Sequence, residues 1–159
     1  MKMPILQPLP IKTKEAANVI YRIFIWVFSI RQWRVCEDWH YTLRDGTNIL
    51  IPTGFTFDGA SIPRLLWMFL SPTGLLFIPG LIHDYAYKYN KLLSVDTDGN
   101  LVDYQAGAGK AYWDKVFRET GIEVNGITFI AFLAWFALAI GGWLPWWKHR
   151  NFERLQRKI

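Results

Sequence analysis

An uncharged run near the C-terminus is the longest apolar stretch of the chain. Residues 127–147 contain no Asp, Glu, Lys or Arg, and a helix of this length would reach about 31 Å, close to the hydrocarbon thickness of a bilayer. Tryptophans sit at its end and basic residues follow, so we predict a transmembrane helix whose basic tail, residues 148–159, lies in the cytoplasm. A buried core hairpin that breaks at Gly141, Gly142 and Pro145 is the alternative.

A second apolar segment, residues 16–30, lies near the N-terminus and is interrupted by Arg22. As a helix it would reach about 22 Å, which is short for a span. It could lie in the membrane interface, or it could cross the membrane as the first arm of a hairpin. We therefore divide residues 1–32 into an extended leader, residues 1–11, and an apolar interfacial or membrane helix.

Strand patterns open the region between the two apolar segments, residues 33–126. Residues 33–43 and 48–57 are rich in β-branched and aromatic side chains, and Asp45 and Gly46 lie between them. An Asp-Gly pair between two such runs is typical of the tight turn of a β-hairpin. We therefore expect a β-hairpin here.

Helical patterns follow in two places, over residues 78–92 and 107–120. We predict that the second helix stops at Gly121, because glycine commonly ends helices. The whole pattern predicts an α+β fold. In it, residues 33–126 form one domain with a small β-hairpin or sheet packed on two antiparallel helices, and the C-terminal transmembrane helix follows.

Composition and charge favour a membrane surface as partner. The chain has nine Trp, seven Tyr and eleven Phe in 159 residues, and such side chains gather where apolar matter meets water. The net charge of +5 is +3 over residues 1–30, −2 over 31–126 and +4 over 148–159. Basic ends beside apolar segments favour anionic lipid, whereas a nucleic-acid partner would favour basic residues across the folded domain. The single Cys36 excludes an internal disulfide.

Ionisable residues interrupt the first helical pattern. His83 and Asp84 lie within an apolar run, where charged side chains are costly unless they are paired or used. On a helix Tyr87 shares their face, and Asp114 would meet His83 if the two helices pack antiparallel. Such a pair supplies a general base and the carboxylate that orients it, with a water as nucleophile. Asp84 would then be free to bind a hard cation such as calcium.

A structural interpretation of these residues stays open. His83, Asp84 and Asp114 could form a buried network in which each satisfies the hydrogen bonds of the others. The two remaining histidines, His40 in a strand pattern and His149 in the tail, have no second cluster of ligand-type residues nearby. A zinc site is therefore not expected.

Asp58, Ser61 and Arg64 form a second polar cluster. Its structural interpretation is a cap, in which Asp58 and Ser61 precede a helix that begins near Ile62. Its functional interpretation sets Asp58 or Arg64 beside His83, as a further cation ligand or as a clamp for a phosphate. A nucleophilic Ser61 is not expected, because no G-x-S-x-G motif surrounds it.

Four motifs resemble the phage and bacterial family called domain of unknown function 1353. They are Ile51-Pro-Thr-Gly-Phe55, Phe57-Asp-Gly-Ala-Ser-Ile-Pro-Arg64, His83-Asp-Tyr-Ala-Tyr87 and Trp113-Asp-Lys-Val-Phe117. The resemblance covers about residues 33–120 and leaves the terminal apolar segments outside. It implies that the chain is phage-encoded, and it implies no particular activity.

The motif His83-Asp84-x-x-Tyr87 with the later Asp114-x-x-Phe117 is also similar to the secreted phospholipase A2 family. This second resemblance implies that His83 activates a water and that Asp84 binds calcium. It also implies that Asp114 and Tyr87 hold the histidine. The chain departs from that family because it lacks the flanking disulfide cysteines and the glycine-rich calcium loop, for which residues 71–74 are the nearest substitute.

Two hypotheses of different classes follow. The first is a membrane-anchored, phospholipase-A2-like hydrolase of lipid esters, phage-encoded, with His83, Asp114 and Tyr87 as catalytic residues and Asp84 and Asp58 as calcium ligands. The second is a non-catalytic phage membrane or virion protein in which the same residues are scaffold. Both imply a phospholipid membrane and other phage proteins as partners, and the host inner membrane or the virion as location. An open cleft at His83 favours the enzyme, and a His83 sealed by aromatic rings favours the scaffold.

Overall fold

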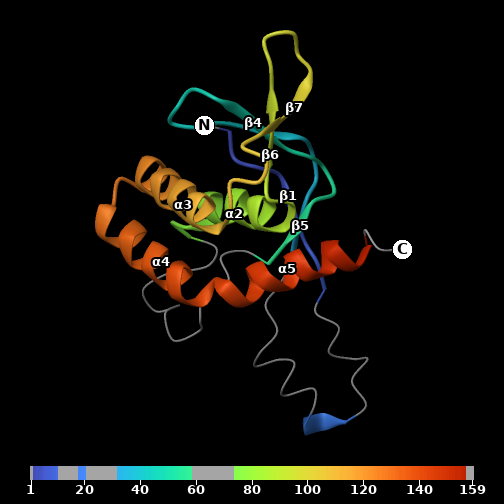
Figure 1. Ribbon diagram of the computed structural model, residues 1–159. Helices are drawn as coiled ribbons and strands as arrows, with labels where there is room; N and C mark the ends of the chain where they lie inside the picture. The colour runs from blue at the N-terminus through green and yellow to red at the C-terminus, as the bar shows by residue number, and fades with distance from the viewer. Residues whose placement is uncertain (1, 11–17, 21–31, 59–73, 157–159) are drawn as a thin grey trace.

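The computed structural model describes residues 2–10, 18–20, 32–58 and 74–156 of the chain (Figure 1). Its architecture confirms the predicted α+β class, because two small antiparallel sheets lie on a group of packed helices. Most of the apolar segment 16–30, together with Ser61, Arg64 and residues 71–73, lies outside the described residues, so the predictions made for them stay predictions.

The first sheet joins three short strands in the order β1-β2-β5. These strands are β1 (Leu6–Pro8), β2 (Trp33–Val35) and β5 (Thr56–Phe57). Leu6 pairs with Val35, so part of the expected leader is a strand of the domain. The predicted leader is thus extended over this strand, and its backbone groups find their partners in β2.

The second sheet has the order β3-β4-β6-β7. Its strands are β3 (Trp39–Thr42), β4 (Asn48–Ile51), β6 (Leu92–Val95) and β7 (Leu101–Tyr104). The predicted hairpin is confirmed for β3 and β4, which pair antiparallel around a turn where Gly46 has a φ of +86°. The strand patterns at 33–43 and 48–57 are each divided between the two sheets. The prediction of a single hairpin did not include this division.

Two antiparallel helices, α2 (Phe77–Tyr89) and α3 (Lys110–Asn125), support the candidate site. The predicted end of the second helix at Gly121 is wrong, since α3 continues to a left-handed cap at Gly126. Gly121 instead lies where α3 meets its neighbours, because a Cβ there would come within 3.5 Å of the Ala131 Cβ. A small residue here permits close packing, and the left-handed Gly126 ends the helix.

The C-terminal apolar run forms two helices, α4 (Thr128–Gly141) and α5 (Trp143–Gln156), which meet at an angle of 52°. Within the described ranges no single helix is both long enough and apolar enough to cross a membrane, and only the bent pair together meets that requirement. The prediction of one straight transmembrane helix over 127–147 is thus not confirmed. The helix breaks at Gly142, one of the positions at which the alternative prediction placed a break, because glycine weakens a helix.

The core lies between the sheets and α2. Ile49, Ile51, Leu81 and Leu92 are fully buried there, and Trp113 brings α3 into the same cluster. A second, smaller cluster joins α3 to α4 through Leu76, Phe117 and Ala134. Helices α4 and α5 run along the helical side of the molecule, away from the β6–β7 hairpin (Figure 1). This arrangement packs α2 and α3 between the sheets and α4.

Candidate functional site

Asp114 is the centre of a buried polar cluster between α2 and α3. Its Oδ1 atom lies 3.0 Å from the Nε2 atom of His83 and accepts a 2.5 Å hydrogen bond from the Tyr87 hydroxyl. Its Oδ2 atom accepts a 2.6 Å hydrogen bond from the Nζ atom of Lys110. The structure therefore brings together the three residues that the spacing suggested, and it adds a lysine.

Burial and pairing set the charge states of this cluster. Burial alone would raise the pKa of Asp114, but hydrogen bonds from His83, Lys110 and Tyr87 hold that pKa below its ordinary value. Burial lowers the pKa of His83, and Lys110 lowers it further against the pull of Asp114. Burial also raises the pKa of Tyr87, as does the hydrogen bond to Asp114. At neutral pH the cluster thus contains an ionised aspartate beside a neutral imidazole.

The sequence interpretation missed Lys110. Its side chain is only 7% exposed, and its Nζ atom also donates to the main-chain oxygens of Leu138 at 3.0 Å and Ala139 at 3.3 Å. The signal that could have found it is its position four residues before Asp114 on the same helix, which puts opposite charges on one face. Lys110 therefore ties the centre of the cluster to the C-terminal end of α4.

A second carboxylate, Asp84, follows His83 on α2 and is differently placed. Its Oδ2 atom is buried and has no hydrogen-bond partner among the described residues. Burial raises the pKa of Asp84 well above its ordinary value, and the nearby carboxyl group of Asp58 raises it further. Two carboxyl groups thus share one site, and the ionised state of Asp84 is disfavoured.

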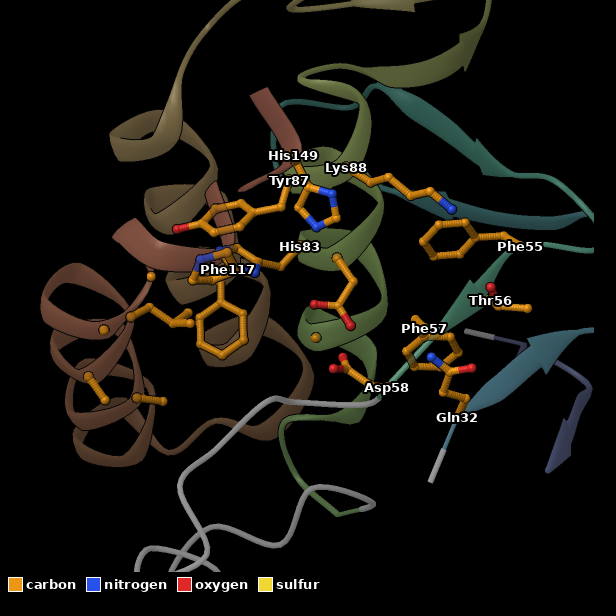
Figure 2. A pocket seen from close by; sticks show the side chains of 18 residues that line it. Gln32, Phe55, Thr56, Phe57, Asp58, His83, Tyr87, Lys88, Phe117 and His149 are labelled. Carbon is orange, nitrogen blue, oxygen red and sulfur yellow. The ribbon is translucent and has the colours of Figure 1, made fainter. Parts of the chain in front are cut away.

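A cavity of about 410 Å³ adjoins both aspartate sites (Figure 2). His83, Asp84 and Asp58 line one part of it. Small or apolar residues of α4 and α5 line another part, namely Ala134, Ala137, Leu138, Gly141, Gly142 and Pro145. The cavity therefore combines a polar side that carries titratable groups with an apolar side.

His83 is neither sealed nor openly exposed. Its ring centroid lies 3.9 Å from that of Tyr87 and 5.3 Å from that of Phe117, and the residue is 5% exposed. It nevertheless contributes to the cavity wall, and its Nδ1 atom makes no hydrogen bond to the described residues. The nitrogen that Asp114 leaves unused is thus available to a molecule in the cavity.

His149 is a further residue that the sequence interpretation set aside. It was assigned to a basic tail, yet Figure 2 shows its side chain among those that line the cavity. It comes there because α5 packs against α2, where Arg150 donates to the main-chain oxygens of Tyr87 and Lys88. No local pattern announces this long-range contact. His40 is exposed on β3, as expected of a surface histidine.

Metal ligands are sparse in the described part of the chain. No group of three or more His, Cys, Asp or Glu residues is arranged there to hold a metal ion. Asp84 and Asp58 are two oxygen donors of the type that calcium prefers. A cation bound by them would need its remaining ligands from main-chain or water oxygens.

Fold and site together define a small α+β protein with a buried His-Asp-Tyr-Lys cluster at the wall of a half-apolar cavity. The sequence model of DUF1353, described as a protein of unknown function, matches residues 33–138, which is more than half of the chain. The chain belongs to this family. The match includes most of α4, so the expectation that the C-terminal apolar segment lies outside the family is wrong for residues 128–138.

Comparison with other proteins adds no further likeness. No curated protein and no solved structure matches the chain. The resemblance to phospholipase A2 therefore rests on the motif residues alone.

Proposed function

We propose that this protein is a phospholipase-A2-like hydrolase of ester-linked lipids in which His83 is the general base. The observation that supports this most is the position of His83. Its Nε2 atom is paired with Asp114, while the residue lines a cavity whose other side is apolar. A base beside an apolar wall suits a substrate that joins a polar ester to an acyl chain.

The neutral imidazole can take a proton from a water in the cavity. The Nε2–H group of His83 donates to Asp114, so the lone pair on Nδ1 accepts the water proton while the water oxygen attacks the ester carbonyl carbon. The ester C–O bond then breaks, and the imidazolium returns its proton to the leaving alcohol. Asp114 stays ionised and stabilises the imidazolium.

Tyr87 and Lys110 act on the base through Asp114. Each donates a hydrogen bond to the carboxylate, which fixes its orientation and keeps it ionised. Neither needs to touch the substrate. They are positioning residues, and their removal is expected to misalign the imidazole rather than abolish the base.

Calcium is part of the proposal because of the buried, unpartnered Oδ2 atom of Asp84. Asp84 and Asp58 would hold the ion, and their shared site would then no longer contain uncompensated carboxyl groups. When bound, calcium supplies positive charge that polarises an ester carbonyl.

A membrane location completes the proposal. Within the described residues, the bent pair α4–α5 is the element that is long and apolar enough to reach across a membrane. The basic tail 148–159 begins within α5. Since Arg150 is bonded to α2, the start of that tail lies on the same side as the domain. We therefore propose that the domain lies with its tail at the cytoplasmic face of a host inner membrane, for a protein of phage origin.

A second candidate is a non-catalytic phage membrane or virion protein. The observation that favours it is the full pairing of Asp114, whose two oxygens accept bonds from residues that are all buried. Such a satisfied network also serves to specify a fold. In this case the cavity would bind no substrate, and other phage proteins would be the partners.

The test is release of fatty acid and lysolipid from phospholipid vesicles by the purified full-length protein, with calcium and with chelator. His83→Gln should reduce the rate at least about hundredfold, because a general base contributes on that scale. His40→Gln, at an exposed histidine, should leave it unchanged. No release by wild type, or equal release by His83→Gln, would exclude the hydrolase.

A further inference from the structure

Helices α4 and α5 expose a continuous apolar row on one face. Its members are Phe129, Phe132, Phe136, Ile140, Trp143, Leu144 and Trp147. Within each helix they recur at intervals of three and four residues, apart from the adjacent Trp143 and Leu144, and this spacing puts the members on α4 on one side of α4 and those on α5 on one side of α5. Phe129 is 75% exposed and Leu144 78% exposed. Side chains of this size, contiguous and exposed, mark an interaction face rather than a chance surface.

The opposite face of the pair is already occupied by the domain. Ala131 and Ala134 are buried, and α4 packs on α3. At the break, a Cβ on Gly142 would lie 2.7 Å from the Tyr87 hydroxyl, so the backbone passes directly over the polar cluster. Lipid therefore cannot surround this helix pair, although it can reach the apolar row.

Basic side chains accompany the row. Residues 127–151 contain no Asp or Glu, Lys148 is exposed, and the whole tail 148–159 has a net charge of +4 from five basic residues and one acidic residue. The Arg118 guanidinium lies 4.8 Å from the centre of the Phe132 ring, which sets a further cation beside the row. This charge complements an anionic surface.

We propose that α4–α5 is an in-plane docking element for an anionic lipid bilayer. The apolar row enters the boundary between headgroups and acyl chains, and the basic residues contact the headgroups. The packed face stays on the domain and keeps the cavity at the membrane surface. This inference builds on the proposed membrane association, but it does not depend on the chemistry at His83.

Vesicle flotation of the full-length protein tests the partner. Vesicles of phosphatidylcholine with phosphatidylglycerol should bind it, and phosphatidylcholine alone or high salt should weaken binding. The double variant Phe129→Ser with Phe136→Ser should bind at least about tenfold more weakly, because two exposed rings of the row are lost. Leu101→Ser with Val102→Ser is the matched control on β7, where both residues are also exposed, and it should bind as wild type.

The depth at which residues of α4–α5 enter the bilayer distinguishes in-plane docking from a membrane span. An environment-sensitive fluorophore is attached in a Cys36→Ser background at Phe129→Cys, Phe136→Cys or Trp147→Cys. In-plane docking predicts a blue shift and a similar, shallow depth at all three positions, whereas a span would put position 136 deepest. Leu101→Cys should show no shift.

Three results would overturn the inference. They are unchanged binding by the double variant, a maximum of depth at position 136, and a wild-type dimer that the double variant abolishes without any lipid binding by either protein. Failure of the hydrolase proposal would look different. His83→Gln should bind vesicles as wild type does, whether or not the wild type releases fatty acid.

Discussion

The fold gives two aspartates near His83 opposite electrostatic environments. Asp114 receives hydrogen bonds from His83, Tyr87 and Lys110, and they lower its pKa despite burial. Asp84 has a buried oxygen without a partner, and both its burial and the carboxyl group of Asp58 raise its pKa. The difference shows that burial alone does not determine whether an aspartate is ionised. The hydrogen-bond donors around the carboxyl group determine it as well. In the proposed function, Asp114 would therefore hold the base, and Asp84 would be a ligand of the ion.

The largest effect is expected for Asp114→Asn. This change leaves the buried Lys110 without an ionised partner, so the free energy of unfolding should fall by about 4 kcal/mol. Urea unfolding at neutral pH measures it. A loss below about 1 kcal/mol would mean that the cluster does not hold an ionised aspartate.

Lys110→Met removes the same ion pair from the other side. We expect a loss of about 3 kcal/mol, because the carboxylate keeps two other donors but the charge is no longer balanced. Lys115→Met is the matched control. Lys115 also forms an ion pair on α3 with the residue four positions later, Glu119, but its side chain is 56% exposed. Its effect should stay within about 0.5 kcal/mol. Equal effects of the two substitutions would contradict the burial argument.

Tyr87→Phe removes one donor and leaves the ring. The hydrogen bond to a charged acceptor predicts a loss of about 2 kcal/mol in the free energy of unfolding. Tyr89→Phe, two residues on at an exposed position, should change it little. Thermal unfolding of both variants under the same buffer compares them. If Tyr87→Phe were as stable as Tyr89→Phe, the hydrogen bond to Asp114 would make no contribution to the free energy of unfolding.

Asp84→Asn should have the smallest effect and the opposite sign. Because the folded-state pKa of Asp84 is raised, its ionisation destabilises the fold as pH rises above the ordinary carboxyl value of 3.8. Without calcium, Asp84→Asn should therefore stabilise the protein at neutral pH, by about 1 kcal/mol. The gain should shrink as the pH falls toward 3.8. A destabilised Asp84→Asn protein at neutral pH would show that Asp84 has an energetic partner.

The contacts of His83 with Asp114 and Tyr87 could be predicted from the sequence, because they follow from local spacing. Tyr87 lies one helical turn after His83, and antiparallel packing was enough to bring Asp114 to them. The hairpin of β3 and β4 was predictable for the same reason, since its turn is local. The Tyr87 spacing and the hairpin turn are local, whereas the contact of His83 with Asp114, 31 residues apart, also needed the packing of two helices.

Long-range contacts account for what the sequence did not predict. The pairing of β2 with β1 and β5 joins segments far apart in the chain, and each strand has only two or three residues. His149 reaches the cavity because α4–α5 bends by 52° after α4 and α5 packs against α2. Lys110 looked like an ordinary helical lysine, since its burial depends on the carbonyl groups of α4. Packing between distant segments decided these features.

The most direct test of the two-aspartate account is to measure calcium binding and lipid hydrolysis together in three proteins: wild type, Asp84→Asn and Asp114→Asn. Equilibrium dialysis with radioactive calcium gives the affinity, and fatty-acid release gives the rate. The account predicts that Asp84→Asn loses calcium binding, while Asp114→Asn keeps it but hydrolyses at least about tenfold more slowly. Calcium binding that is equal in wild type and Asp84→Asn, or absent from wild type, would contradict it.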